Sequence, residues 1–442
     1  MRLVQTIKNI FKIEDLRARL FYTLGIILLY RLGKYISLPG IDPSQLAGLK
    51  SQTSSGIMGL LDMFSGGAFS QASVFALGIM PYISASIVVQ LLGIVFPYFQ
   101  KLQREGESGR RKMNQYTRYL TVAILVLQAP TYLVNLHAQL PDTAFIIKGS
   151  FFTVSSVIIL TAGTMFVMWL GERITDKGIG NGISLIIMIG IIARMPTSFI
   201  FEAGTRMNGA GGAIALIVEI VILFAVIFGT ILLVQGTRRI PVQYARRIVG
   251  NKQYGGVRQY IPLKVNAAGV MPIIFAQAIM MLPIIIAGYA ESGSGFVVAF
   301  SNMYGFWYNL VTAILIIAFT YFYTAVTINP VQMAEDMKKN GGFIPGVKPG
   351  RKTVDFFDTI MSRITLPGSI FLAIIAILPS IAVQVGISPQ FAQFYGGTSL
   401  LILVGVILDT LQQIESHLLM RHYDGLMKSG RVKGRAGGVT SI

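Results

Sequence analysis

Long runs of apolar residues, separated by shorter polar segments, dominate this chain. A helix of about 20 apolar residues is long enough to cross the hydrocarbon core of a bilayer. Ten such runs predict membrane-spanning helices at 18–36, 70–95, 116–136, 151–170, 183–201, 213–234, 266–287, 307–327, 364–383 and 398–415. The pattern therefore predicts an all-α membrane protein with ten transmembrane helices and with both termini on the same side of the membrane.

The second run contains more polar residues than a helix that only anchors a protein in lipid. It reads GGAFSQASVFALGIMPYISASIVVQLL over residues 66–92, with Pro81, Gln90 and several serines among its apolar residues. Polar side chains are costly against hydrocarbon, so this segment is expected to line a water-filled cavity or a seam between helices. A proline-kinked span whose polar groups are hydrogen-bonded inside a bundle is the alternative.

The basic residues are concentrated in alternate loops. The chain has 442 residues, of which 53% are hydrophobic and 13% charged, and its net charge is +18. Most of its Lys and Arg lie between the apolar runs rather than along one continuous surface, so the net charge by itself does not indicate a nucleic-acid-binding protein. The positive-inside rule places both termini and the long basic loops in the cytoplasm. The first apolar run is not followed by a cleavage site, so a signal peptide is not expected.

Two of the basic loops, 235–264 and 328–363, are long and combine aromatic residues with glycine and proline turns. Topology requires only a few charges beside each span. The length and composition of these loops therefore predict docking to RNA or to an acidic protein surface. Loops that only fix the topology and contact anionic headgroups are the alternative.

A short apolar stretch at 57–64 is too short to cross the membrane. Ser54 or Ser55 would cap such a half-helix, and Gly66 with Gly67 would end it. The residues alone allow two interpretations, a surface turn or a stopper that lies in a cavity.

Catalytic chemistry is almost absent from the predicted spans. The chain has no cysteine, and its histidines, His137, His417 and His422, have no metal-binding spacing. The ionisable residues expected within the hydrocarbon zone are Arg31, Glu219 and Asp409. They do not form a protease-like pair, so neither an enzyme nor a bound cofactor is predicted.

Several long and irregular segments stand out along the chain: MFSGGAFSQASVFALGIMPYISASIVVQLL, GESGRRKMNQYTRYLT, GTMFVMWLGERITDKGIGNGISLII, PLKVNAAGVMPIIFA, YTAVTINPVQMAEDMKKNGGFIPGVKPG and FYGGTSLLILVGVILDT. They resemble, in the same order, segments of the SecY family, the large subunit of the bacterial protein-conducting channel, and the resemblance covers nearly the whole chain. The resemblance implies two inverted halves, 1–205 and 206–425, that form a clamshell around an hourglass pore, followed by a basic cytoplasmic tail at 426–442.

The resemblance also assigns site residues. An apolar pore ring is implied, with members Ile79, Ile83, Ile187, Ile191, Ile274 and Ile402. A re-entrant plug half-helix is implied at about 56–67, with Ile57, Met58, Leu60, Leu61, Met63, Phe64, Gly66 and Gly67. Gln90 and Asn266 are implied as polar contacts of a lateral gate. The implied docking residues for the motor ATPase SecA and for the ribosome are Arg246, Arg247, Lys348, Arg351 and Lys352.

The resemblance implies a translocon subunit of the bacterial cytoplasmic membrane that passes unfolded polypeptides and releases hydrophobic segments into lipid. The implied partners are small subunits similar to SecE and SecG, the ATPase SecA, the ribosome, signal sequences, nascent chains and anionic lipids. The chain departs from the family at Lys348, where an arginine is common, so a bidentate contact is lost there. A secondary transporter is the main rival, but it should have a polar substrate site where this chain has isoleucines.

Overall fold

The computed structural model describes residues 13–46, 62, 65–147, 149–209, 212–244, 247–249, 252–254, 258–277, 279–280 and 302–428. The chain divides into two compact units. Unit 1 comprises Met1–Thr53, Leu60–Ala193 and Val406–Ile442, and unit 2 comprises Ser54–Gly59 and Arg194–Gly405. The division into inverted halves at 205 stays a prediction.

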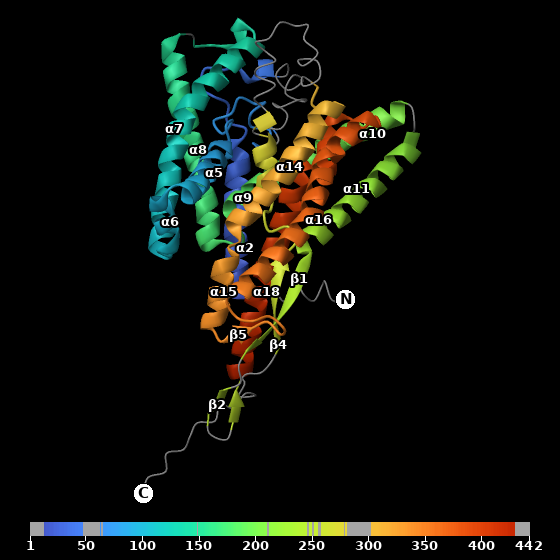
Figure 1. Cartoon of the computed structure of the whole chain (residues 1–442). Coiled ribbons are helices and arrows are strands. Elements are labelled where there is room, and N and C mark those ends of the chain that lie inside the picture. The colour runs from blue at the N-terminus through green and yellow to red at the C-terminus, as the bar shows by residue number, and fades with distance from the viewer. Residues whose placement is uncertain are drawn as a thin grey trace. The chain divides into compact units, whose positions relative to one another are not determined.

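Unit 1 is a helical bundle whose members before Ala193 are coloured blue to green in Figure 1, and it also includes the red second part of α18 (Gly397–Lys428) from Val406 onward. Its helix α7 packs against α5 and α8, and α8 packs against α2 and α9. Two short 3-10 turns, η1 (Pro43–Leu46) and η2 (Asp142–Ala144), lie in its connections. The helices are α2 (Glu14–Gly33), α5 (Met80–Val95), α6 (Pro97–Arg104), α7 (Glu107–Gln139), α8 (Ser150–Lys177) and α9 (Gly182–Ile192).

The second predicted span is shorter than the sequence indicated. Residues 65–79 form turns, and the helix α5 begins only at Met80, with Pro81 in its first turn. The prediction of a helix from residue 70 is therefore wrong. The reason is local, because proline favours the start of a helix and the preceding Gly78 has a φ of +56°. At its other end α5 bends by 103° into α6.

Unit 2 contains the remaining helices. They are α10 (Met195–Asn208), α11 (Gly212–Gln235), α14 (Phe306–Thr327), α15 (Pro330–Lys339), α16 (Arg351–Gln384), α17 (Pro389–Ala392), the 3-10 turn η3 (Gln393–Tyr395) and the start of α18 (Gly397–Lys428), which continues into unit 1. The helix α16 packs along α14, and α10 packs along α11.

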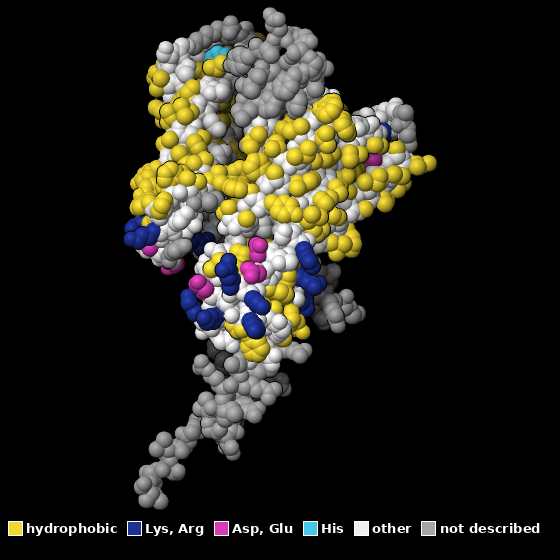
Figure 2. All heavy atoms as spheres, viewed as in Figure 1, with side chains coloured by type: hydrophobic (Ala, Val, Ile, Leu, Met, Phe, Trp, Pro, Cys, Tyr) yellow, Lys and Arg dark blue, Asp and Glu magenta, His cyan; other side chains and the backbone are white. Residues whose placement is uncertain are grey.

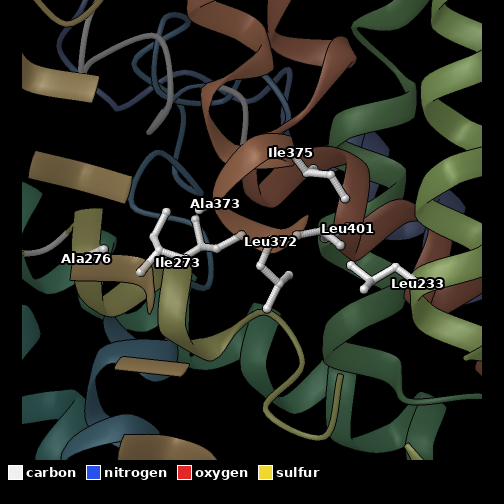
Figure 3. Close-up of a cluster of buried hydrophobic side chains, with 8 residues drawn as sticks. Leu233, Ile273, Ala276, Leu372, Ala373, Ile375 and Leu401 are labelled. Atoms are coloured by element: carbon white, nitrogen blue, oxygen red, sulfur yellow. The ribbon is translucent and has the colours of Figure 1, made fainter. Parts of the chain in front are cut away.

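A buried apolar cluster joins α11, α14, α16, α18 and the segment 271–277 of unit 2 (Figure 3). These helices are held together by side-chain packing, while they also carry exposed apolar residues. The members are Leu233 of α11, Ile273 and Ala276, Ile316 of α14, Leu372, Ala373 and Ile375 of α16, and Leu401 of α18.

The two long basic loops form strands as well as turns. From the first loop come β1 (Thr237–Tyr244), β2 (Arg247–Val249), β3 (Lys252–Tyr254) and β4 (Arg258–Lys264), and from the second comes β5 (Gly342–Phe343). The strands β4, β1 and β5 form one antiparallel sheet in that order, while β2 pairs with β3. Val242 and Phe357, both fully buried, belong to the apolar core between this sheet, α15 and the start of α16.

Seven helical stretches of the described residues are long and apolar enough to cross a membrane, of which Gly182–Asn208 comprises α9 and α10 and Phe306–Lys339 comprises α14 and α15. The bent pair α5 and α6 would make eight. The chain is therefore a multi-pass, mainly helical membrane protein. Two predicted spans account for most of the difference from ten. The first corresponds to α2, which carries three arginines in addition to its acidic first turn, and the seventh, at 266–287, is described only as far as residue 280.

Candidate functional site

Residues 65–79 form a buried, non-helical segment within unit 1. Asp62 organises its beginning, because its backbone carbonyl accepts from the Gly67 amide at 2.7 Å and its Oδ1 accepts from the Ser70 amide at 2.8 Å. The Ser65 hydroxyl donates to the Asp62 carbonyl and accepts from the Phe69 amide. These bonds satisfy backbone groups that would otherwise be costly inside a membrane protein.

The start of this segment packs tightly against the backbone of its neighbours. A Cβ atom added to Gly66 would lie 2.9 Å from the Cα of Gly190 in α9, and one added to Gly78 would lie 3.3 Å from the Cα of Ser65. Gly66 and Gly67 have φ values of +66° and +86°. This left-handed backbone favours glycine at both positions, and the contact with Gly190 gives a second reason for glycine at 66.

Four of the six predicted pore-ring residues lie in unit 1. Ile79 directly follows Gly78, whose backbone lies against Ser65. Ile191 directly follows Gly190, whose backbone lies against Gly66. Ile79, Ile187 and Ile191 are buried, and Ile83 is partly buried. The Ile83 amide bonds to the Ile79 carbonyl, which places these two side chains one helical turn apart.

The other two predicted ring residues lie in unit 2. Ile274 is partly buried on the helical segment 271–277, and Ile402 is buried on α18. The arrangement of all six around one axis stays a prediction. Of the predicted plug residues, Ile57, Met58, Leu60, Leu61, Met63 and Phe64 lie outside the described residues.

The two predicted lateral-gate residues are in different environments. Gln90 is exposed on α5, where its Nε2 donates to the Ser86 hydroxyl at 3.4 Å. Asn266 is partly buried in the turn after β4, and its Oδ1 is buried without a hydrogen-bond partner among the described residues. Their role in a gate stays a prediction.

The predicted docking residues belong to the region around the small sheet of unit 2. Arg246 lies outside the described residues, and Arg247 begins β2. Lys348, Arg351 and Lys352 are exposed, and the last two form the first turn of α16. Figure 2 shows hydrophobic side chains covering α14 and α16, with Lys and Arg gathered at the end of unit 2 that carries the sheet.

The position of Arg351 and Lys352 works against helix stability. The N-terminus of a helix carries partial positive charge, so cations there are unfavourable by a few tenths to about 1 kcal/mol. Two adjacent exposed cations at this position are therefore not explained by the stability of α16. They add positive charge to the exposed surface at this end of unit 2.

A buried charged cluster in unit 2 was only partly visible in the sequence. The Nη2 of Arg206 lies 2.6 Å from Oε1 of Glu219, and its Nε lies 3.1 Å from Oε1 of Glu202. Arg206 also donates to the Gly386 carbonyl, and Glu202 accepts from the Ser388 amide. Glu219 is thus a structural ion-pair partner. Glu202 was missed, although its spacing of four residues from Arg206 on one helix was a usable signal.

The other two intramembrane candidates differ from Glu219. Arg31 donates to a backbone carbonyl of the non-helical segment, and Asp409 is exposed on α18. Within the described ranges, no group of three His, Asp or Glu side chains is arranged to hold a metal ion.

A bundle of apolar helices around a buried non-helical segment, together with a basic sheet on the other unit, defines a multi-pass membrane protein of the channel or transporter kind. The SecY family model matches residues 73–411, and the chain belongs to the SecY family. Two curated relatives are named Protein translocase subunit SecY. The protein of Corynebacterium glutamicum is 43% identical over 95% of this chain and 98% of its own length. The protein of Mycobacterium bovis is 45% identical over 94% of this chain and 97% of its own length.

Solved structures share the fold. One described as "The structure of a protein conducting channel" has a TM-score of 0.59 and 18% identity, and covers 90% of this chain and 92% of its own. Another, Sec61 in the canine ribosome-channel complex, has a TM-score of 0.55 and 17% identity, and covers 90% of this chain and 92% of its own.

Proposed function

We propose that this chain is the channel-forming subunit of a bacterial protein translocase. It passes unfolded polypeptides across the cytoplasmic membrane and releases hydrophobic segments sideways into lipid. The observation that carries the proposal is the identity of 43–45% to proteins named Protein translocase subunit SecY, over 94–95% of the chain. A solved structure with the same fold is described as a protein-conducting channel.

The proposed pore works by excluding water. Ile79, Ile83, Ile187, Ile191, Ile274 and Ile402 form an apolar neck in this proposal. Such a neck can close around a threading chain without binding it, and it conducts ions poorly because a narrow apolar constriction loses its water. Hydrophobic segments leave through a gate beside Gln90 and Asn266, because transfer into lipid is favourable for them and unfavourable for polar segments.

The proposed plug comprises residues 57–65, with Gly66 and Gly67 as the hinge at its end. Two observations support this assignment. The hinge has the left-handed backbone that lets a chain reverse direction, and Gly66 lies against the backbone of Gly190, beside Ile191, while the preceding Ser65 lies against Gly78, beside Ile79. A stopper attached at this point would remain close to those two members of the proposed neck.

The proposed orientation places both termini and the small sheet in the cytoplasm, following the distribution of basic residues. There the exposed Lys348, Arg351 and Lys352, with Arg246 and Arg247, form the docking surface for SecA and the ribosome. One structural neighbour is described within a ribosome-channel complex, which supports this assignment by analogy. Small subunits similar to SecE and SecG, together with anionic lipids, complete the proposed assembly.

Reconstitution tests the function directly. The chain, purified with its small partner subunits, is incorporated into vesicles with a SecA-type motor, ATP and a precursor protein that carries a signal sequence. Protease-protected precursor should accumulate only with ATP and a functional signal sequence. Uptake of a small solute driven by an ion gradient, with no precursor protected, would instead support a secondary transporter.

A second experiment addresses the channel alone. Deletion of residues 57–65 should raise the resting ion conductance of the complex in planar bilayers while translocation continues. The undeleted complex is the control. Unchanged conductance would contradict the plug assignment, and loss of all translocation by a well-folded complex would contradict a role limited to sealing.

A further inference from the structure

Side chains from two helices of unit 1 hold three carbonyl groups at the start of the non-helical segment. The Tyr30 hydroxyl donates to the Ser65 carbonyl at 3.2 Å, and the Arg31 Nη1 donates to the Gly66 carbonyl at 3.3 Å. From α7, the Tyr132 hydroxyl donates to the Phe69 carbonyl at 3.0 Å. The two residues from α2 are adjacent in sequence, and they hold two consecutive carbonyls.

These bonds matter because the carbonyls lie outside any helix. Inside a membrane protein, a backbone carbonyl without a helical partner must find another donor, and leaving it without one is costly. Arg31 supplies the donor to the Gly66 carbonyl from a neighbouring helix, and Tyr30 adds a donor to the Ser65 carbonyl, which also accepts from the Ala68 amide at 3.4 Å. They therefore favour one position of residues 65 and 66 over any displaced position.

Tyr30 is held in place by the same segment. Its ring is 2% exposed and stacks on Phe75 with centroids 6.2 Å apart and planes within 12° of parallel. Phe75 in turn lies against Gly33, where an added Cβ atom would meet the phenyl ring. The hydroxyl of Tyr30 is thus directed at the Ser65 carbonyl by packing that does not depend on the hydrogen bond.

Arg31 has a different character. It is a charged residue within a predicted span, and a charge at that depth is expensive unless it has a specific role. Its guanidinium reaches the Gly66 carbonyl, at the position where the backbone has a φ of +66° and touches Gly190. A donor that carries charge makes a stronger bond to a carbonyl than a neutral donor does.

We propose that Tyr30 and Arg31 form a latch that holds residues 65–67 in the closed position of the channel. The proposal rests on the proposed function, because Tyr30 and Arg31 can act as a latch only if residues 57–65 form a plug. Movement of Ser65 and Gly66 out of this position breaks both bonds to α2. Tyr30 and Arg31 are therefore positioning residues that set how often the resting channel opens.

Conductance of the full channel complex tests the latch. Tyr30→Phe keeps the ring on Phe75 and removes only the hydroxyl, and Arg31→Met removes the donor and the charge. Loss of one bond to a buried carbonyl should raise the displaced population by about tenfold, and the resting ion leak should rise accordingly. Arg31→Lys, which keeps the charge and a donor, should lie between wild type and Arg31→Met.

A matched control exists in unit 2. The Tyr395 hydroxyl donates to the Glu219 carbonyl at 2.8 Å, so Tyr395→Phe also removes a buried hydroxyl bonded to a backbone carbonyl. This variant should leave the leak unchanged. An equal rise in Tyr395→Phe and Tyr30→Phe would overturn the latch, because the effect would then come from general loosening of the fold.

Chemical labelling gives a second, independent measurement. The chain has no cysteine, and Ser70 in the segment is 2% exposed, so a single Ser70→Cys reports on movement of the segment. Its reaction with a maleimide should accelerate by about tenfold when Tyr30→Phe is added. Unchanged labelling and unchanged leak would overturn the proposal.

Deletion of residues 57–65 separates the latch from the proposed function. If the deletion raises the leak and the Tyr30 and Arg31 variants do not, the latch is wrong and the plug stands. If neither the deletion nor the variants raise the leak, the plug assignment itself is wrong.

Discussion

The guanidinium of Arg206 lies 2.6 Å from the carboxylate of Glu219, within the helical hairpin of α10 and α11. The same guanidinium bonds to Glu202, whose side chain is fully buried. A lone carboxylate in an apolar span is expensive, and pairing is the usual way in which it is accommodated. This relationship explains Glu219 without a role in proton transfer.

Removal of Arg206 should therefore destabilise unit 2 strongly. Arg206→Met leaves Glu202 and Glu219 buried without their cation, and breaking such a pair costs about 3–5 kcal/mol. The thermal stability of the purified complex measures this loss. Arg118→Met is the control, because Arg118 pairs with Glu172 at an exposed site, where a pair contributes at most about 1 kcal/mol. Equal losses in the two variants would contradict the structural role of the cluster.

The contact of Gly66 with Gly190 makes Gly66→Ala a sharp test of the proposed hinge. The added methyl group would lie 2.9 Å from the Gly190 Cα atom, so one backbone must move. We expect a raised resting conductance of the complex. Gly106→Ala is the matched control, because Gly106 has a similar φ of +71° but nothing within 4 Å of an added Cβ atom. A similar conductance in both variants would show that the contact does not hold the hinge.

The proposed apolar neck should respond to polarity rather than to small changes of volume. Replacing several of the six isoleucines by glycine or serine should widen and wet the neck, and single-channel conductance should rise. Ile187→Val alone removes one methyl group and should change the conductance little. Unchanged conductance in the multiple variants would show that these residues do not line the constriction.

Charge reversal at the start of α16 should separate binding from stability. Arg351→Glu with Lys352→Glu should weaken the binding of SecA or ribosomes, and the loss should shrink as salt rises, because screening weakens interactions between exposed charges. The same change should leave the thermal stability unchanged or slightly higher, since acidic residues suit a helix N-terminus. The same design applies to Arg246 and Arg247. Binding that is unaltered at low salt would contradict the docking assignment.

Much of the helical architecture could be predicted from the apolar runs. Long runs such as 213–234 and 307–327 correspond closely to α11 and α14, because a span must satisfy its backbone internally and so forms a helix. The segment before Met80 could not be placed in the same way, since its apolar composition fits a helix as well as buried turns. Pro81 was the available signal, because proline is preferred in the first turn of a helix.

The small sheet was missed for a different reason. In β1, Ile240 and Val242 are buried on alternate positions, which is the pattern of a strand. Pro241 between them argued against a strand, because proline lacks an amide donor. The structure accommodates it, since β1 pairs with β4 at Pro241 and with β5 only at Gln243 and Tyr244.

The charged cluster shows the limit of sequence reasoning about single residues. Glu219 was conspicuous because it interrupts an apolar run, whereas Arg206 was assigned to a loop between spans. Their pairing depends on how α10 and α11 fold back on each other, which the run lengths do not specify. The ring, the plug and the gate were carried over from the family resemblance, and their geometry stays a prediction.

The helix α16 has a mechanical consequence for unit 2. It runs without a break for 34 residues, about 51 Å, from the exposed Arg351 to Gln384. At its far end, Ser380 donates to Asn309 at 2.8 Å and Gln384 donates to the Tyr304 carbonyl, which fastens it to the beginning of α14. A force applied to its first turn is therefore transmitted along one continuous helix, without crossing a loop. Pro367 and Pro379 each remove a backbone hydrogen bond, so we expect bending of α16 to occur at these two residues.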